Sequence, residues 1–110
     1  METIAFEDFA KVDMRVGRIL SAEPLKGARV PAYALRVDFG ELGVKQSSAR
    51  LTGVYAAEDL PGRLVVAVVN FEPRRIAGYR SEVLVLGVDG EDGVVLLTPE
   101  REVALGQRVL

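Results

Sequence analysis

The stretch Val12-Asp13-Met14-Arg15-Val16-Gly17-Arg18-Ile19 decides the fold class. Up to Val16, apolar and polar residues alternate, which is typical of a half-buried β-strand. After Gly17 the alternation shifts by one residue, because Ile19 is apolar. A glycine at such a shift indicates a β-bulge or a sharp bend. Long first strands that bend in this way are used to turn the corner of a small barrel.

Short segments with strand-like patterns follow this stretch along the chain, separated by turns rich in glycine. A short helix is expected before it, over residues 5–10, where apolar residues recur at helical spacing. One helical turn is expected within residues 53–62. Further strands are expected over residues 33–39, 44–51, 64–69, 83–88 and 94–97, with a short edge strand within 103–110.

This order of elements predicts an all-β fold in a single domain over residues 1–110. Many short strands with turns between them are typical of a small barrel or a sandwich. The bent first strand and the helical turn between the third and fourth strands favour a five-stranded OB-fold barrel. The composition, 49% apolar and 27% charged, is that of a globular domain.

Two of the expected strands, residues 64–69 and 83–88, carry apolar side chains on both faces. A barrel has only one interior, so the outer faces of these strands need a cover. A second copy of the chain would supply it, which predicts a homodimer. Alternatively, the N- and C-terminal extensions cover these faces within one chain.

Several function classes are excluded by what the chain lacks. It contains no Cys and no His, which excludes Ser-His-Asp and Cys-His triads and Cys/His zinc sites. It has neither a Walker motif nor a G-x-G-x-x-G motif. We therefore expect no catalytic residue, no metal and no cofactor. The acidic N-terminus and the shortness of every apolar run predict a cytoplasmic protein without membrane insertion.

Two segments are candidates for binding. The third expected strand carries small hydroxyl side chains between two cations, which indicates either a shallow polar groove or an ordinary solvent-facing strand. Residues 70–82 gather three Arg and two aromatics between two buried strands. Aromatics beside Arg at the rim of a barrel suit stacked bases or extended peptide, although an ordinary charged surface loop would look similar. The candidate binding residues are Lys45, Ser47, Ser48, Arg50, Asn70, Phe71, Arg74, Arg75, Ile76, Tyr79, Arg80 and Ser81.

The first strand also resembles a known family. Asp13-Met14-Arg15-Val16-Gly17-Arg18-Ile19 is similar to the D-x-R-V-G-x-I opening of the tRNA-binding OB domains, and the resemblance extends over residues 6–110. Within that family the chain is most similar to the CsaA-type branch of chaperone-like factors. The stretches that carry this likeness are Ala28–Ala32, Gly43–Ala49, Val68–Gly78 and Ser81–Gly87.

The resemblance implies a homodimeric cytoplasmic protein that binds unfolded, exported preproteins and a SecA-type translocation ATPase. In that role Phe71, Ile76 and Tyr79 would contact apolar side chains, while Ser48 and Asn70 would hydrogen-bond to the peptide backbone. The surrounding cations would set client preference.

Two alternatives stay open, a structural tRNA-binding module and a module that serves assembly only. The tRNA-binding relatives usually have a small residue and Met after the Ser that corresponds to Ser81. Here Val83 and Leu84 stand in place of the small residue and Met, and Glu82 places negative charge beside the candidate nucleic-acid face. The net charge of −2 also favours polypeptide over tRNA.

Overall fold

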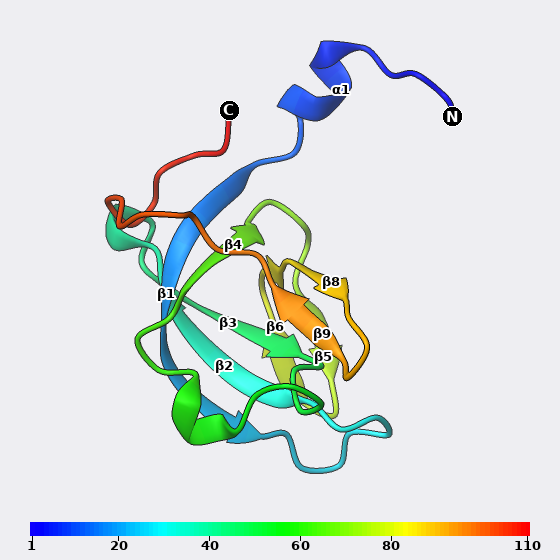
Figure 1. Ribbon diagram of the computed structural model, residues 1–110, viewed down its shortest axis with the longest axis vertical. Helices are drawn as coiled ribbons and strands as arrows, with labels where there is room; N and C mark the ends of the chain where they lie inside the picture. Colours follow the sequence, from blue (N-terminus) through cyan, green and yellow to red (C-terminus); the bar gives the residue numbers. More distant parts are fainter.

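A five-stranded antiparallel sheet curls into a nearly closed barrel in the computed structural model, which describes residues 1–110 (Figure 1). The strand order is β3-β2-β1-β4-β7, and two short hairpins, β5–β6 and β8–β9, extend from it. The all-β OB-type barrel predicted from the sequence is confirmed. The strands are β1 (Met14–Pro24), β2 (Tyr33–Asp38), β3 (Val44–Ala49), β4 (Leu64–Val68), β5 (Arg74–Ile76), β6 (Tyr79–Ser81), β7 (Leu84–Val85), β8 (Gly87–Asp89) and β9 (Val94–Leu96).

The helical segments are short, as the sequence predicts. The α-helix α1 (Phe6–Ala10) projects from one end of the barrel, and the 3₁₀ turn η2 (Ala57–Asp59) lies between β3 and β4. A second 3₁₀ turn, η1 (Gly40–Leu42), connects β2 to β3. No helix of the structure has the length and apolarity needed to cross a membrane.

The long strand β1 joins the two halves of the barrel. Its first part pairs with β4 and its second part with β2. The predicted irregularity is present, but the pairing with β2 shifts between Ile19 and Ser21 rather than at Gly17. Gly17 instead permits close packing, because a Cβ built there would lie 2.6 Å from Cγ1 of Val37 and 2.7 Å from the ring of Phe39.

The barrel interior is filled from every strand of the main sheet and from the turns around it. The alternation expected in β2 is confirmed, because Leu35 and Val37 are buried while Arg36 between them is exposed. Such alternation places successive side chains on opposite faces of the sheet. The ten buried residues of the core are Ile19, Tyr33, Leu35, Val37, Phe39, Leu51, Leu60, Val65, Ala67 and Val83.

The segment between β4 and β7 is more regular than a surface loop. Residues 74–81 form the hairpin β5–β6, closed by the two-residue turn Ala77-Gly78. Both turn residues have positive φ, 50° and 81°, as the tight hairpin turn of this class requires. The loop interpretation of residues 70–82 is therefore wrong for most of that segment.

The expected strand over residues 83–88 divides into β7, which pairs with β4, and β8, which pairs with β9. The C-terminal tail pairs with β1 as an edge, through the bridge between Arg15 and Arg108. The predicted edge strand is therefore reduced to a single bridge, and no strand follows β9. The tail does not cover the outer side of β7 and β8, because Leu84 and Val88 remain exposed.

We predict that Gly17→Ala lowers the free energy of unfolding by about 1–3 kcal/mol, because the added methyl group overlaps the fully buried Val37 and Phe39. Urea denaturation measures the effect. Ser21→Ala, a half-buried position on the same strand, is the matched control and should change stability by much less. An unchanged midpoint for Gly17→Ala would contradict the packing described here.

Candidate binding surface

The free edge of β3 is joined to residues 81–83 mainly through side chains. The backbone N–H of Gln46 donates to Oε1 of Glu82 over 3.0 Å, and the backbone N–H of Ser48 donates to Oγ of Ser81 over 3.0 Å. One backbone bond, from Glu82 N–H to the carbonyl of Gln46, completes this edge at 2.8 Å. The side chains of Ser81 and Glu82 thus take the place of strand carbonyls and close the barrel.

Ser47 belongs to the same closure but from the inside. Its hydroxyl is fully buried and donates to the carbonyl of Val83 over 3.0 Å. The structure therefore places Ser47 within the barrel rather than in a surface groove. Ser48 is half-buried against Ser81, with 3.5 Å between the two hydroxyl oxygens. Ser47, Ser48 and Ser81, all predicted as site residues, therefore stabilise the barrel beneath the candidate binding surface.

The side chain of Asn70 also hydrogen-bonds to the backbone. Its Oδ1 accepts the backbone N–H of Asp13 at 3.0 Å, and its Nδ2 donates to the carbonyl of Lys11 at 2.7 Å. Nη2 of Arg108 donates to the carbonyl of Ala10 at 2.8 Å. Asn70 and the C-terminal tail therefore fix the direction in which α1 leaves the barrel.

An ion cluster ties the two ends of the chain to β1. Asp13 accepts two hydrogen bonds from Arg15, at 2.6 and 3.2 Å, and Nε of Arg108 lies 3.4 Å from it. The hydrogen bond from Arg15 is the main reason that the pKa of Asp13 is lowered, and the positive charges of Arg15 and Arg108 act in the same direction against partial desolvation. Nη1 of Arg15 also donates to the carbonyl of Gly106 at 3.0 Å, which holds the tail on β1.

The hairpin β5–β6 is fastened over β2 by Tyr79. Its hydroxyl donates to the carbonyl of Leu35 at 2.8 Å, and burial raises the pKa of this phenol. The positive charge of Arg36 lowers the pKa of Tyr79 and the negative charges of Glu82 and Glu23 raise it, but burial is the largest cause. Tyr79 therefore forms a half-buried wall, and it is not a free stacking platform.

The Arg side chains of the hairpin point to solvent. Arg74, Arg75 and Arg80 are all exposed. Nη1 of Arg75 donates to the carbonyl of Gly78 at 3.1 Å, and Arg80 is 3.7 Å from a carboxylate oxygen of Glu82.

Next to this hairpin lies the loop between β1 and β2. A Cβ built on Gly27 would lie 3.9 Å from the Cβ of Ala77 in the hairpin turn. Lys26 and Arg29 of that loop are exposed. We call the exposed cations of the loop, of β2 and of the hairpin the basic hairpin surface; they are Lys26, Arg29, Arg36, Arg74, Arg75 and Arg80.

The remaining predicted residues take different places around this surface. Phe71 is 55% exposed just before the hairpin, and Ile76 is half-buried at its turn. Lys45 and Arg50 lie at opposite ends of β3. Sequence reasoning missed Lys26, Arg29 and Arg36. The alternation within β2 could have placed Arg36 on the outer face, whereas no local pattern brings the loop beside the hairpin.

Comparison with known proteins agrees with this geometry. The family described as "Putative tRNA binding domain" matches residues 14–108. The chain belongs to this family. Its match includes β1, the basic hairpin surface and the tail that pairs with β1.

Solved structures extend the comparison over the whole chain. The chain is 49% identical to the chaperone CsaA from Bacillus anthracis, covering 99% of this chain and 100% of that one with a TM-score of 0.88. It is 44% identical to the CsaA chaperone protein from Picrophilus torridus, covering 98% and 100% with a TM-score of 0.93. The predicted likeness to the CsaA branch is confirmed by these identities and TM-scores over the full length of the chain.

A longer relative shares the same domain. The chain is 38% identical over 109 residues to a methionine–tRNA ligase from Thermococcus onnurineus. That match takes in 99% of this chain but 15% of the ligase, so the chain spans about a seventh of the length of this relative.

We predict that Glu82→Ala lowers the free energy of unfolding by about 1–3 kcal/mol, because the N–H of Gln46 loses its acceptor. Glu82→Gln keeps an oxygen acceptor and should stay close to the unsubstituted protein. Urea denaturation gives the stability, and hydrogen exchange at Gln46 and Ser48 reports on the edge itself. A Glu82→Ala variant as stable as the unsubstituted protein would show that this side chain does not close the barrel.

Proposed function

We propose that this chain is a chaperone-like binding protein for unfolded polypeptides, including preproteins destined for export, and that it acts without catalysis. The observation that carries the proposal is the set of solvent-directed Arg side chains on a hairpin held rigidly to the barrel, beside the exposed ring of Phe71. The full-length likeness to two CsaA chaperones supports it.

An extended polypeptide offers groups that suit this surface. Guanidinium groups donate hydrogen bonds to peptide carbonyls and to carboxylates, and their planar faces pack on aromatic rings. Phe71 and Ile76 supply apolar contact beside them. The side chains of Tyr79 and Asn70 already bond to the barrel backbone, so we assign them to support of the surface rather than to hydrogen bonding with the client. The Ser48 hydroxyl has only the 3.5 Å contact with Ser81 and stays available for a client.

Release of a client needs a partner in this proposal, since the chain has no nucleotide-binding motif. A cytoplasmic SecA-type ATPase that receives the preprotein would fill that role. The basic hairpin surface would then hold the client only until transfer.

A tRNA-binding module is the second candidate function, and the same cations favour it. Arg36, Arg74 and the loop residues Lys26 and Arg29 have no ion-pair partner in the structure. Unpaired cations on an exposed surface suit phosphate groups. The family description and the shared domain of the methionine–tRNA ligase point the same way.

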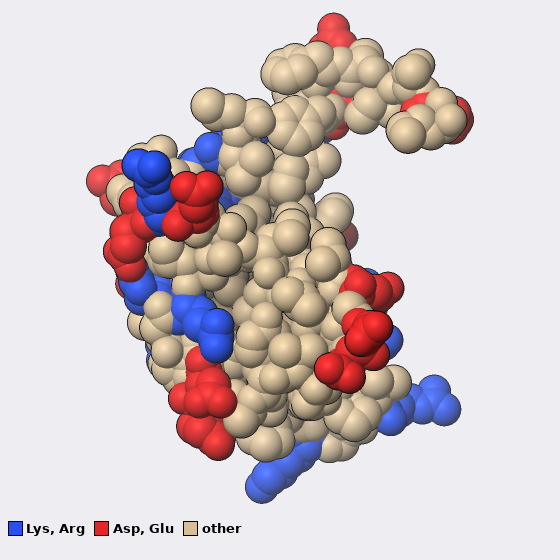
Figure 2. Space-filling model, viewed as in Figure 1, with Lys and Arg blue, Asp and Glu red and all other residues tan.

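A homodimer is part of the proposal. By strand register, Leu84 and Val88 lie on one face of the β7–β8 segment, and Val95 and Leu97 lie on the same face of the β9 segment. These four side chains are between 40% and 53% exposed. Figure 2 shows that the face over β4, β8 and β9 is largely uncharged, with charged side chains around its rim.

The projecting helix adds further apolar surface. Ile4 is 72% exposed and Phe6 is 75% exposed, although Asn70 and Arg108 hold the base of α1 firmly. Apolar patches of this kind on a small domain are typical of association surfaces. A second copy would cover them and would present two basic hairpin surfaces to one extended client, which raises avidity.

Fluorescence anisotropy of a labelled, unfolded preprotein segment tests the binding proposal. We expect binding that survives excess unlabelled tRNA and that weakens about tenfold or more when Arg74 and Arg75 are both changed to Ala, as expected for loss of charged hydrogen bonds. Lys11→Ala removes an exposed cation outside the hairpin and serves as the control. Full displacement by tRNA with a steep salt dependence would favour the tRNA module instead. No binding of either ligand would favour a module for assembly alone.

Analytical ultracentrifugation tests the dimer. We expect the unsubstituted chain of 11.9 kDa to sediment at twice that mass and Val88→Asp to sediment as a monomer, because a charge would enter the apolar contact. Val44→Asp, which alters an exposed apolar residue on β3, is the control and should remain a dimer. A monomeric unsubstituted chain would refute the proposed association.

A further inference from the structure

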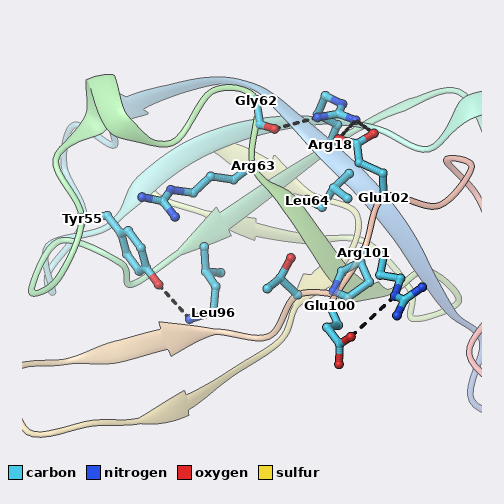
Figure 3. A pocket seen from close by; sticks show the side chains of 11 residues that line it. Arg18, Tyr55, Gly62, Arg63, Leu64, Leu96, Glu100, Arg101 and Glu102 are labelled. Atoms are coloured by element: carbon cyan, nitrogen blue, oxygen red, sulfur yellow. Dashed lines mark hydrogen bonds and ion pairs between the residues drawn. The ribbon is translucent and has the colours of Figure 1, made fainter.

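A hollow of about 360 Å³ lies on the outer side of the barrel, between the start of β4 and the segment that follows β9 (Figure 3). This volume falls within the range of small-molecule sites, about 300–1,000 Å³. Neither the hairpin β5–β6 nor the loop between β1 and β2 contributes to it. Its lining residues are Arg18, Tyr55, Gly62, Arg63, Leu64, Leu96, Thr98, Pro99, Glu100, Arg101 and Glu102.

Four of the five charges in the hollow neutralise one another. Nη2 of Arg18 donates to both carboxylate oxygens of Glu102, at 3.1 and 3.2 Å. Nε of Arg101 lies 3.6 Å from a carboxylate oxygen of Glu100. Arg63 has no carboxylate partner. The hollow therefore carries one positive charge that an anionic ligand could balance.

The Arg63 side chain is held in place before any ligand arrives. Its backbone N–H donates to the carbonyl of Leu60 at 3.1 Å, and its carbonyl accepts the N–H of Ile19 at 2.9 Å. Its Nε donates to the carbonyl of Asp59 at 2.9 Å. Its guanidinium carbon lies 5.1 Å from the centre of the Tyr55 ring. Only the two Nη groups are left without a protein acceptor, and they form the end that recognises carboxylates.

Tyr55 is equally well anchored, so the platform under the guanidinium is rigid. The phenol oxygen of Tyr55 accepts the backbone N–H of Leu96 at 3.1 Å, and its carbonyl accepts the hydroxyl of Tyr33 at 2.7 Å. Figure 3 shows Arg63 extended toward Tyr55 with Leu96 beside them, while Leu64 lies nearer to Arg18 and Glu102. Preorganised groups of this kind lose little freedom on binding.

We propose that this hollow binds a carboxylate attached to a small apolar group. The Nη groups of Arg63 hold the carboxylate, and Leu64 and Leu96 contact the apolar group. The C-terminal residue of a polypeptide and a free small carboxylic acid share this chemistry. The site is separate from the basic hairpin surface and does not depend on the function proposed for it.

Titration of the protein with N-acetyl-leucine, followed by ¹H–¹⁵N NMR, tests the site. We expect saturable shifts of the amides of Arg63, Leu64 and Leu96, and no such shifts with the uncharged N-acetyl-leucinamide. Arg63→Gln should weaken binding about tenfold or more, because it removes a charged pair of hydrogen bonds. Arg63→Lys keeps the charge but cannot donate two parallel hydrogen bonds, so its affinity should fall between those of the unsubstituted protein and Arg63→Gln.

Lys11→Gln is the control, since it removes an exposed cation that does not line the hollow. It should change the affinity by no more than about twofold. The dispersion of the NMR spectrum shows whether each variant is folded. Absence of shifts with N-acetyl-leucine, equal shifts with the amide, or unchanged affinity of Arg63→Gln would each overturn the proposal.

A short peptide ending in Leu with a free carboxylate distinguishes the two ligand sources. Tighter binding of the peptide than of N-acetyl-leucine, lost on C-terminal amidation, would assign the site to polypeptide ends. Equal affinity of the two would assign it to free carboxylic acids. Because Arg63 lies outside the hairpin, a negative result here leaves the test with Arg74 and Arg75 unaffected.

Discussion

Closure of the barrel depends on hydrogen bonds between the edge of β3 and the side chains of Ser81 and Glu82. The main sheet ends at β3 on one side and at the two-residue β7 on the other, and these strands do not pair with each other. An open edge of β3 would leave its backbone N–H groups exposed or without an acceptor, and this would lower the stability of a small domain. A hydroxyl and a carboxylate supply the missing acceptors. The core, with the buried Ser47 at its margin, is sealed behind them.

Short and long polar side chains have different roles in this chain. The small polar side chains of Ser47, Ser81 and Asn70 bond to the backbone and hold strands, the hairpin and α1 in place. The long cationic side chains of the basic hairpin surface extend outward. Side-chain length therefore decides the role of a polar residue here. A short side chain bonds to the nearest backbone and supports the fold, whereas a guanidinium extends beyond the backbone and can contact a ligand. A rigid base of this kind keeps the Arg positions fixed relative to one another.

Much of the fold could be predicted because it depends on local patterns. The alternation in β2, the long bent β1 and the helical turn before β4 are all visible in sequence windows of a few residues. The hairpin β5–β6 escaped prediction because its strands have three residues each, too few for a period to appear, although Ala77-Gly78 carries a turn signal. The hydrogen bonds of Asn70 could not be predicted because its partners, Lys11 and Asp13, are 59 and 57 residues away in sequence. The position of the basic loop beside the hairpin likewise follows from tertiary folding, not from spacing.

Both ends of the chain leave the barrel at one pole, and the loop between β1 and β2 lies at the opposite pole with the turn of the hairpin beside it (Figure 1). A segment fused to either terminus therefore extends away from the basic hairpin surface. A segment similar to the whole chain makes up 15% of the methionine–tRNA ligase from Thermococcus onnurineus, and attachment through either end would leave these cations uncovered. The direction of the two termini thus makes the geometry of the basic hairpin surface independent of what is joined to either end.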